Sequence, residues 1–170
     1  MKNIFILILL TCVITMNAQM SRTISDDKSG KSIMYGECNK DSFLRADFAE
    51  WFNKEYNSYK VNDTVFAENY ETTFDSIKVF LGSWCEDSQR EVPRFIKIME
   101  TFPFFYNVEI RYFCVDRAKK CDVINPEDYY VDLVPTFIFY KRGEELCRII
   151  ETPRVTLEND IKDLLWRIQK

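Results

Sequence analysis

The strongest constraint on the fold is a short apolar run that leads into an amphipathic helix. Residues 77–81 (Ile-Lys-Val-Phe-Leu) are apolar except for one lysine, and Gly82 and Ser83 end the run. Apolar residues then recur at helical spacing over residues 91–99, and a second apolar run follows at residues 108–115. The order strand, helix, strand predicts two parallel strands joined by a right-handed crossover. Residues 84–88 form the junction between the first strand and the helix.

The C-terminal part adds a hairpin and a last helix. The apolar runs at residues 137–140 and 146–150 are separated by a turn with Gly143. Glycine accepts the positive φ of tight turns, so this pattern predicts a hairpin. After Thr156, a candidate N-cap, apolar side chains recur at helical spacing through residues 157–168. We therefore expect an α/β fold in which a central mixed β-sheet is flanked by helices.

The N-terminal half is less regular. Leu44, Phe48 and Trp51 follow Asp41, a candidate N-cap, at the spacing of one helical face. This spacing predicts a helix over residues 41–58. Residues 61–73 look like a connector, and residues 19–40 are polar and are expected to form an extended lead-in. The predicted domain is therefore 41–170, with its core motifs in 74–170.

Residues 1–18 have the pattern of a signal peptide. Lys2 supplies a positive charge, residues 4–16 are almost entirely apolar, and Ala18 is a small residue at a suitable cleavage position. The run is shorter than the about 20 residues that span a bilayer. A lipid anchor at Cys12 stays open as an alternative. We expect an exported protein of the periplasm or another extracytoplasmic space, which meets a membrane only if this N-terminus is retained or lipidated.

The chain has six cysteines and no histidine. Without histidine it has no Ser-His or Cys-His nucleophile pair and no Cys₂His₂ zinc site, and we expect neither metal nor cofactor. A net charge of −4 without a large basic cluster argues against a nucleic-acid partner. If cleavage removes Cys12, five cysteines remain, so at least one thiol is left over.

Four sequence features occur in order within residues 74–170. They are Trp84-Cys85 after the first strand, Pro93 in the helix, Val134-Pro135-Thr136 before the hairpin, and Gly143 at its turn. In this order they resemble the thioredoxin superfamily. The resemblance implies a thioredoxin-like fold with an N-terminal helical extension. It also implies that Cys85 is a nucleophile that attacks disulfides, in a Cys-x-x-Ser variant of the family's active-site motif.

The same resemblance implies supporting roles for other residues. Pro135, with a cis peptide bond, would present a backbone edge beside Cys85, and Val134 and Thr136 would help to bind a substrate strand there. Asp116 would hold the indole N–H of Trp84. The chain departs from the family at position 79. The family has a buried acid there that assists proton transfer, and this chain has Val79. With the missing second cysteine, this departure implies either slower monothiol chemistry or a binding module that has kept a cysteine.

The charges around Cys85 oppose one another. The first turn of a helix favours a thiolate by on the order of 0.3–1 kcal/mol, because unpaired N–H groups point at it. Glu86, Asp87 and Glu91 disfavour the thiolate by on the order of 1 kcal/mol each at 4 Å in water, and less when screened. These contributions are comparable, and a hydrogen bond donated by Ser88 would favour the thiolate.

Ser88 also limits the reaction, because a hydroxyl cannot resolve the mixed disulfide that Cys85 would form. Resolution would then need an outside thiol, a thiol of the substrate, or another cysteine of the chain. Cys114 and Cys121 are the internal candidates. The two can equally form a structural disulfide, and both alternatives stay open at this point.

Two functions follow. The first is an exported thiol–disulfide oxidoreductase or isomerase of the monothiol type, acting through Cys85 on a disulfide-containing protein or a small glutathione-like thiol. The alternative is a redox-inactive thioredoxin-fold module that binds an extended peptide at its cis-proline face. An iron–sulfur site with glutathione is disfavoured, because Glu86 and Asp87 stand where such sites use a small neutral pair.

Overall fold

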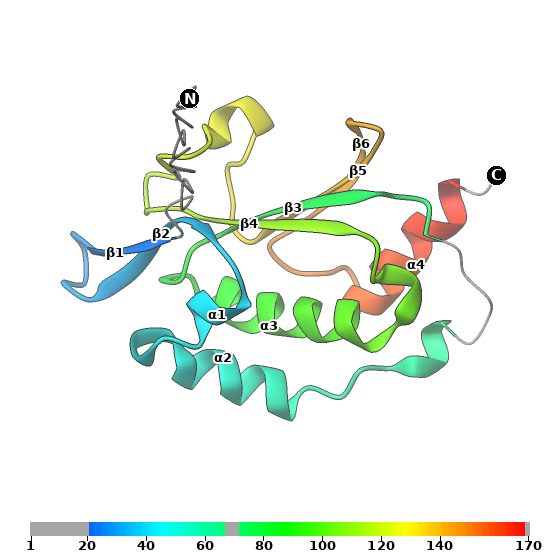
Figure 1. Ribbon diagram of the computed structural model, residues 1–170, viewed down its shortest axis with the longest axis horizontal. Coiled ribbons are helices and arrows are strands. Elements are labelled where there is room, and N and C mark those ends of the chain that lie inside the picture. Colours follow the sequence, from blue (N-terminus) through cyan, green and yellow to red (C-terminus); the bar gives the residue numbers. More distant parts are fainter. Residues whose placement is uncertain (1–20, 67–71, 169–170) are drawn as a thin grey trace, which may run out of the picture.

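The computed structural model of the protein describes residues 21–66 and 72–168. The predicted signal peptide at residues 1–18, with Cys12, lies outside the described residues. Figure 1 shows the elements that the described chain forms. The strands are β1 (Arg22–Ser25), β2 (Ser32–Cys38), β3 (Ser76–Leu81), β4 (Glu109–Cys114), β5 (Thr136–Lys141) and β6 (Glu144–Ile150). The α-helices are α1 (Lys40–Phe43), α2 (Ala46–Ser58), α3 (Glu86–Thr101) and α4 (Leu157–Ile168), and the 3-10 helices are η1 (Asp63–Phe66), η2 (Pro103–Phe105) and η3 (Pro126–Tyr129).

The strands form one mixed sheet in the order β1-β2-β4-β3-β5-β6. Strands β3 and β4 are parallel, and α3 connects them, so the predicted β-α-β unit is confirmed. Every other neighbouring pair is antiparallel. The carboxyl ends of β3 and β4 meet, with Leu81 opposite Cys114. The junction after Leu81 therefore lies at the same sheet edge as the loop after Cys114.

The two faces of the sheet are covered differently. Figure 1 shows α2 and α3 side by side on one face and the segment 115–135 on the other. Alternate residues of each central strand point to opposite faces, as the pleat requires. One set joins the helix-side core, which includes Phe48, Ile77, Val79, Leu81, Phe95, Cys114, Phe137, Phe139 and Ile161. The other joins the loop-side core, formed by Phe80, Phe113, Val115, Val131, Val134, Ile138 and Tyr140.

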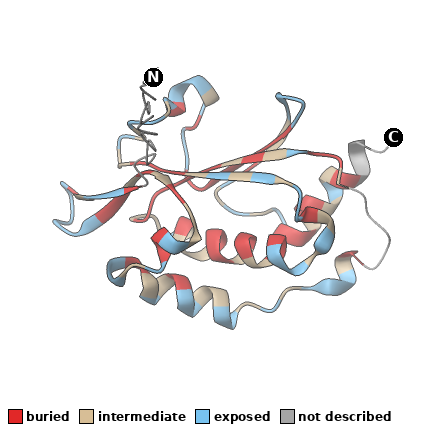
Figure 2. Ribbon diagram, viewed as in Figure 1, coloured by how far each residue is buried: buried red, intermediate tan, exposed pale blue. Residues whose placement is uncertain are grey.

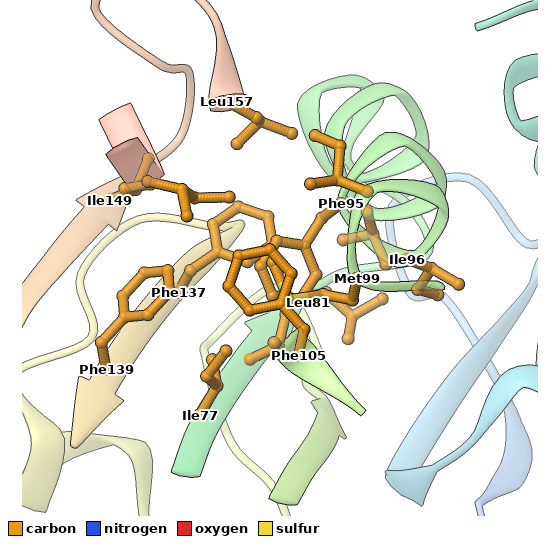
Figure 3. Packing of buried hydrophobic residues seen from close by; sticks show 14 of the residues in the cluster. Ile77, Leu81, Phe95, Ile96, Met99, Phe105, Phe137, Phe139, Ile149 and Leu157 are labelled. Atoms are coloured by element: carbon orange, nitrogen blue, oxygen red, sulfur yellow. The ribbon is translucent and has the colours of Figure 1, made fainter. Parts of the chain in front are cut away.

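The helix-side core is rich in aromatic rings. Figure 3 shows Phe95 of α3 against Phe137 of β5, and their ring centroids are 4.7 Å apart. Phe139 and Leu157 lie in the same cluster, which joins the sheet to α4. Each such side chain stabilises the fold by about 1.5–3 kcal/mol when it leaves water. Figure 2 shows the same division on the ribbon, with buried residues on the sheet-facing side of α3.

The lead-in expected at residues 19–40 is instead part of the sheet. β1 and β2 form an antiparallel pair, and β2 continues onto β4. Ile33 and Met34 of β2 are 3% and 0% exposed. The polar composition of the segment gave no indication of a strand. The strand is stabilised by pairing with β4, which is far away in the sequence.

The helix expected over residues 41–58 is divided. α1 begins after Asn39, whose side chain accepts from Ser42 N, so Asn39 rather than Asp41 is the N-cap. The chain is extended at Arg45, where φ is −64° and ψ is 148°, and α2 then begins at Ala46. As a result, Leu44 is 45% exposed and does not join the inward stripe.

The C-terminal hairpin and helix are confirmed. Arg142 and Gly143 connect β5 to β6 with φ of 53° and 83°, the positive pair of a tight two-residue hairpin turn. The Thr156 hydroxyl accepts from Asn159 N at 3.2 Å and caps α4. Within residues 21–66 and 72–168, no helix combines the length and apolar character that a membrane crossing needs.

Candidate active site

Cys85 lies at the start of α3, directly after the end of β3. It is the N-cap residue of the helix, with φ of −96° and ψ of 124°. Its N–H donates to Gly82 O at 2.9 Å, and its carbonyl accepts from Gln89 N at 3.0 Å. The cysteine is therefore fixed at the positive end of a 16-residue helix, where a negative sulfur is favoured.

The half-buried thiol of Cys85 faces the loop before β5. Its Sγ lies 3.1 Å from Val134 O, so the S–H donates to that carbonyl. The Val134–Pro135 peptide bond is cis, as the resemblance implies. Pro135 O is already bound by Glu151 N at 2.7 Å. The polar backbone group that this loop presents to the sulfur is thus the carbonyl of Val134.

Thr136 has a different place from the one expected. Its side chain is 1% exposed, and its hydroxyl donates to Leu133 O at 2.7 Å. The residue therefore holds the loop in shape and does not offer its side chain to a substrate. Of the three residues expected to bind substrate, Val134 is the one whose polar group contacts Cys85.

Ser88 does not hydrogen-bond to Cys85. Its side chain is fully buried, and its oxygen accepts from Gly82 N at 3.2 Å. The hydroxyl joins the first turn of α3 to the end of the strand before it. Stabilisation of a Cys85 thiolate by Ser88, as expected from the sequence, is therefore not a feature of this structure.

Trp84 is held by a backbone group and not by Asp116. The indole Nε1–H donates to Val115 O at 2.9 Å. The Asp116 carboxylate instead accepts from Lys120 N at 2.8 Å and closes the loop after β4. The ring also lies against Gly82, because a Cβ there would be only 2.6 Å from Trp84 Cε2. Only glycine leaves room for the indole at this position.

The acidic residues near Cys85 are largely paired. Asp87 lies 2.6 Å from Arg90 Nη2, and the buried Glu91 lies 2.7 Å from Arg90 Nε. Arg94 Nη1 adds a second cation 3.7 Å from Glu91. Glu86 is exposed to solvent. The three carboxylates therefore oppose a thiolate less than their sequence positions suggest, because arginines of the next turn balance two of them.

Arg117 is the residue that sequence reasoning missed. Its guanidinium lies 4.7 Å from the centroid of the Trp84 ring and forms two hydrogen bonds with Asp26, at 2.7 and 2.9 Å. These hydrogen bonds raise the pKa of Arg117, and the charge of a Cys85 thiolate acts in the same direction. Arg117 also holds the pKa of the buried Asp26 far below its usual range. Asp26 lies in the segment read as a lead-in, so no sequence signal connected the two.

Cys114 and Cys121, the two cysteines expected to resolve a mixed disulfide, lie on opposite faces of the sheet. Cys114 is 0% exposed and belongs to the helix-side core, whereas Cys85 and Cys121 pack against the loop-side core. Cys114 points away from Cys85 because side chains alternate along β4. Its neighbour is Cys38, with the two Sγ atoms 2.6 Å apart. The structure therefore contradicts both a Cys114–Cys121 pair and direct resolution of Cys85 by Cys114.

A cavity of about 400 Å³ adjoins the junction. Trp84, Glu86 and Gln89 form one wall, and Trp51 of α2 and Lys31 beside β2 form the other. Arg117 also reaches this cavity. The N-terminal hairpin and α2 thus add a partly polar groove beside the cysteine. Within the described chain, no group of three or more Cys, Asp or Glu side chains could hold a metal ion.

The comparisons with known proteins give structural likenesses only. No protein-family model matches the chain, and no curated protein is significantly similar to it in sequence. It is similar to mitochondrial thioredoxin 3 of Saccharomyces cerevisiae in the oxidised form, with 26% identity over 54% of this chain and 80% of that one, and a TM-score of 0.38. Oxidised thioredoxin O2 of Arabidopsis thaliana gives 18% identity over 74% and 89% of the two chains, with a TM-score of 0.41.

The chain's own topology defines the fold. Helix α3 connects the parallel strands β3 and β4, and the β5–β6 hairpin and α4 follow. A cis-proline loop faces the cysteine at the start of α3. The protein therefore has a thioredoxin-like α/β fold.

Proposed function

We propose that the protein carries out monothiol thiol–disulfide exchange through Cys85, on protein disulfides or on mixed disulfides of a small glutathione-like thiol. The observation that carries the proposal is the position of its sulfur. The thiol is half-buried at the N-cap of α3 and faces the carbonyl before a cis-proline. Reactive cysteines occur at helix N-termini and are partly exposed, whereas a cysteine that serves packing alone is buried in apolar surroundings.

The charges around the sulfur support this chemistry. The sulfur lies at the positive end of α3, and Arg117 supplies a cation whose own pKa is raised by hydrogen bonds to Asp26 and by the charge of Cys85. The Val134 carbonyl acts the other way, because it accepts a hydrogen bond from the thiol and offers none to a thiolate. Loss of the thiol proton therefore frees this carbonyl to accept an N–H from an extended substrate.

The exchange needs only thiols and disulfides. The Cys85 thiolate attacks one sulfur of a substrate disulfide, a new S–S bond forms to Cys85, and the other substrate sulfur leaves as a thiolate. A second thiolate, from the substrate or from a small thiol, then attacks the mixed disulfide and releases Cys85. No net oxidation occurs at the protein. Ser88 is buried and Cys114 lies on the other face, so neither resolves the mixed disulfide in this proposal, and the second thiolate comes from outside the chain.

We assign this activity to an exported protein. The proposal rests on the signal pattern of residues 1–18, and disulfide exchange on folded substrates fits an oxidising compartment. N-terminal sequencing of the protein recovered from the periplasmic fraction tests it. A start after Ala18 is the expected result, and an intact Met1 in the cytosolic fraction would contradict export.

The decisive experiment measures capture of a disulfide. The protein is incubated with glutathione disulfide, and adducts are located by intact mass and peptide mapping. One glutathione is expected on Cys85, and none at that site in Cys85→Ser. Cys121→Ser is the matched control, because this half-buried cysteine packs against the same loop-side core. Equal labelling of Cys85→Ser and the wild type would refute the proposed function.

One observation favours the alternative of a peptide-binding module. Leu133 is 45% exposed immediately before Val134, so an apolar side chain lies beside the cis-proline loop. Binding of an extended peptide without cysteine distinguishes the two functions. Unchanged affinity in Cys85→Ala, together with no glutathione capture by the wild type, would establish the module. Affinity that disappears with Cys85→Ala would exclude it.

A further inference from the structure

Cys38 and Cys114 come from distant parts of the chain and meet inside the helix-side core. They are 76 positions apart in sequence and lie on the neighbouring strands β2 and β4. Their Sγ atoms are 2.6 Å apart. Carbon atoms in van der Waals contact lie about 3.5–4.0 Å apart, sulfur is larger than carbon, and a disulfide bond is about 2.05 Å long. The two sulfurs are therefore much closer than packing alone would place them.

The strand register explains why the two side chains converge. Cys114 is opposite Gly36, and Cys38 is opposite Tyr112, so the two cysteines occupy diagonal positions on one face of the sheet. Both cysteines belong to the helix-side core, at 4% and 0% exposure.

We propose that Cys38 and Cys114 form a structural disulfide that joins β2 covalently to the central sheet. Two thiols lose two protons and two electrons, and a small or protein disulfide accepts them and becomes two thiols. A mixed disulfide on one of the pair is the intermediate, and the other cysteine displaces the outgoing thiol. Because both sulfurs are buried, the bond forms while the chain folds or opens locally. The oxidant is one that the proposed compartment of export supplies.

This pair is not a second exchange site. Burial raises the pKa of the Cys38 thiol well above its ordinary value, and contact with Cys114 acts in the same direction. A disulfide there pairs two of the five described cysteines without using Cys85. It leaves Cys85, Cys121 and Cys147 as the other cysteines among the described residues.

Disulfide mapping tests the proposal on the full protein. The wild type and Cys85→Ser are folded in a glutathione redox buffer, alkylated after denaturation without reductant, digested and analysed by mass spectrometry. The expected product is a peptide pair that links Cys38 to Cys114 and is two hydrogens lighter than the separate thiols. Alkylation of both cysteines, or a link from either one to a different cysteine, would overturn the proposal. The Cys85→Ser arm keeps this result independent of the proposed exchange activity.

Thermal unfolding gives a second readout. Reductant is expected to lower the Tm of the wild type by roughly 5–15 °C, because the disulfide closes a long loop in the unfolded chain. The Cys38→Ala/Cys114→Ala variant should show no such difference between oxidised and reduced samples, and the Cys121→Ala control should behave like the wild type. An identical Tm for oxidised and reduced wild type would contradict the proposed role. The mapping result stands even if the double variant does not fold.

Discussion

At the scale of single residues, the proposed reaction at Cys85 involves two groups that come from other parts of the chain. The Val134 carbonyl accepts the S–H at 3.1 Å and so favours the thiol. Arg117 supplies a positive charge whose own pKa is raised by Asp26 and by Cys85. Of the two acidic residues that follow Cys85, Glu86 is exposed and Asp87 is paired with Arg90.

Removal of the Arg117 charge should slow the reaction of Cys85 with iodoacetamide. We expect Arg117→Gln to lower the rate modestly, because a solvent-screened charge has a small effect on a neighbouring thiol. Arg117→Lys should keep most of the rate because it keeps the charge. Rates are measured by mass spectrometry at neutral pH in a Cys121→Ser background. Equal losses in both variants would show that the guanidinium acts through packing and not through charge.

Asp26 should make the fold sensitive to acid. Arg117 and Ser29 hold the pKa of Asp26 far below its usual range, so the folded state keeps the carboxylate charged more strongly than the unfolded state does. This stabilisation is complete above about pH 4, the ordinary value for Asp, and is lost as pH falls through the depressed folded value.

Urea unfolding at about pH 6 and about pH 3 measures this dependence. Asp26→Asn should be less stable than the wild type at the higher pH and should lose less on acidification. Asp27→Asn, at the exposed neighbour, should follow the wild type at both pH values. If Asp26→Asn and the wild type lost equal stability on acidification, Asp26 would not be the group responsible.

At the scale of elements, the β3–α3 junction is built around Gly82. Trp84 lies over this glycine, and its indole N–H donates to Val115 O. Gly82→Ala should therefore cost about 1–3 kcal/mol of unfolding free energy through overpacking. In a Trp84→Phe background the same change should cost much less, because Phe lacks the indole atoms that the new Cβ would meet. A double-mutant cycle by urea unfolding measures the difference. Equal costs in both backgrounds would contradict the contact.

The elements that were predictable are those defined by local patterns. β3, α3 and β4 follow from apolar runs and helical spacing, and the β5–β6 turn follows from Gly143. β2 did not, because its stability comes from pairing with β4 and from burial of Met34. The first helix begins after Asn39, whose side chain caps it. The sequence alone did not show that Asn39, and not Asp41, is the N-cap.

The candidate site divides in the same way. Cys85 and Pro135 were found because they are part of a sequence motif with fixed order. Arg117 and Asp26 were not, since their meeting depends on the N-terminal hairpin reaching the loop after β4. The roles expected of Ser88 and Asp116 were wrong for a shared reason. In both cases a backbone group is the partner where the sequence suggested a side chain. Gly82 N donates to Ser88, and Val115 O accepts from Trp84.

At the scale of the whole molecule, the N-terminal hairpin is a structural part of the sheet edge that carries the candidate site. Met34 N donates to Ser83 Oγ at 2.8 Å, directly beside the junction. Asp26 binds Arg117, and Cys38 contacts Cys114 at the end of β4. Three contacts therefore connect the hairpin to the rest of the domain, to the β3–α3 junction, to the loop after β4 and to β4 itself. We infer that the hairpin unfolds together with the rest of the domain.

Met34→Ala tests this inference on the intact chain. The side chain is 0% exposed in the helix-side core, so its truncation should lower the free energy of unfolding by about 2–5 kcal/mol. Thr23→Ala, at an exposed position of β1, should change it by less than about 0.5 kcal/mol. Urea unfolding followed by far-UV circular dichroism should show one transition, shifted as a whole in Met34→Ala. If the hairpin unfolded independently, Met34→Ala would leave the urea midpoint of the main transition unchanged, because unfolding of the hairpin would not expose the shared core.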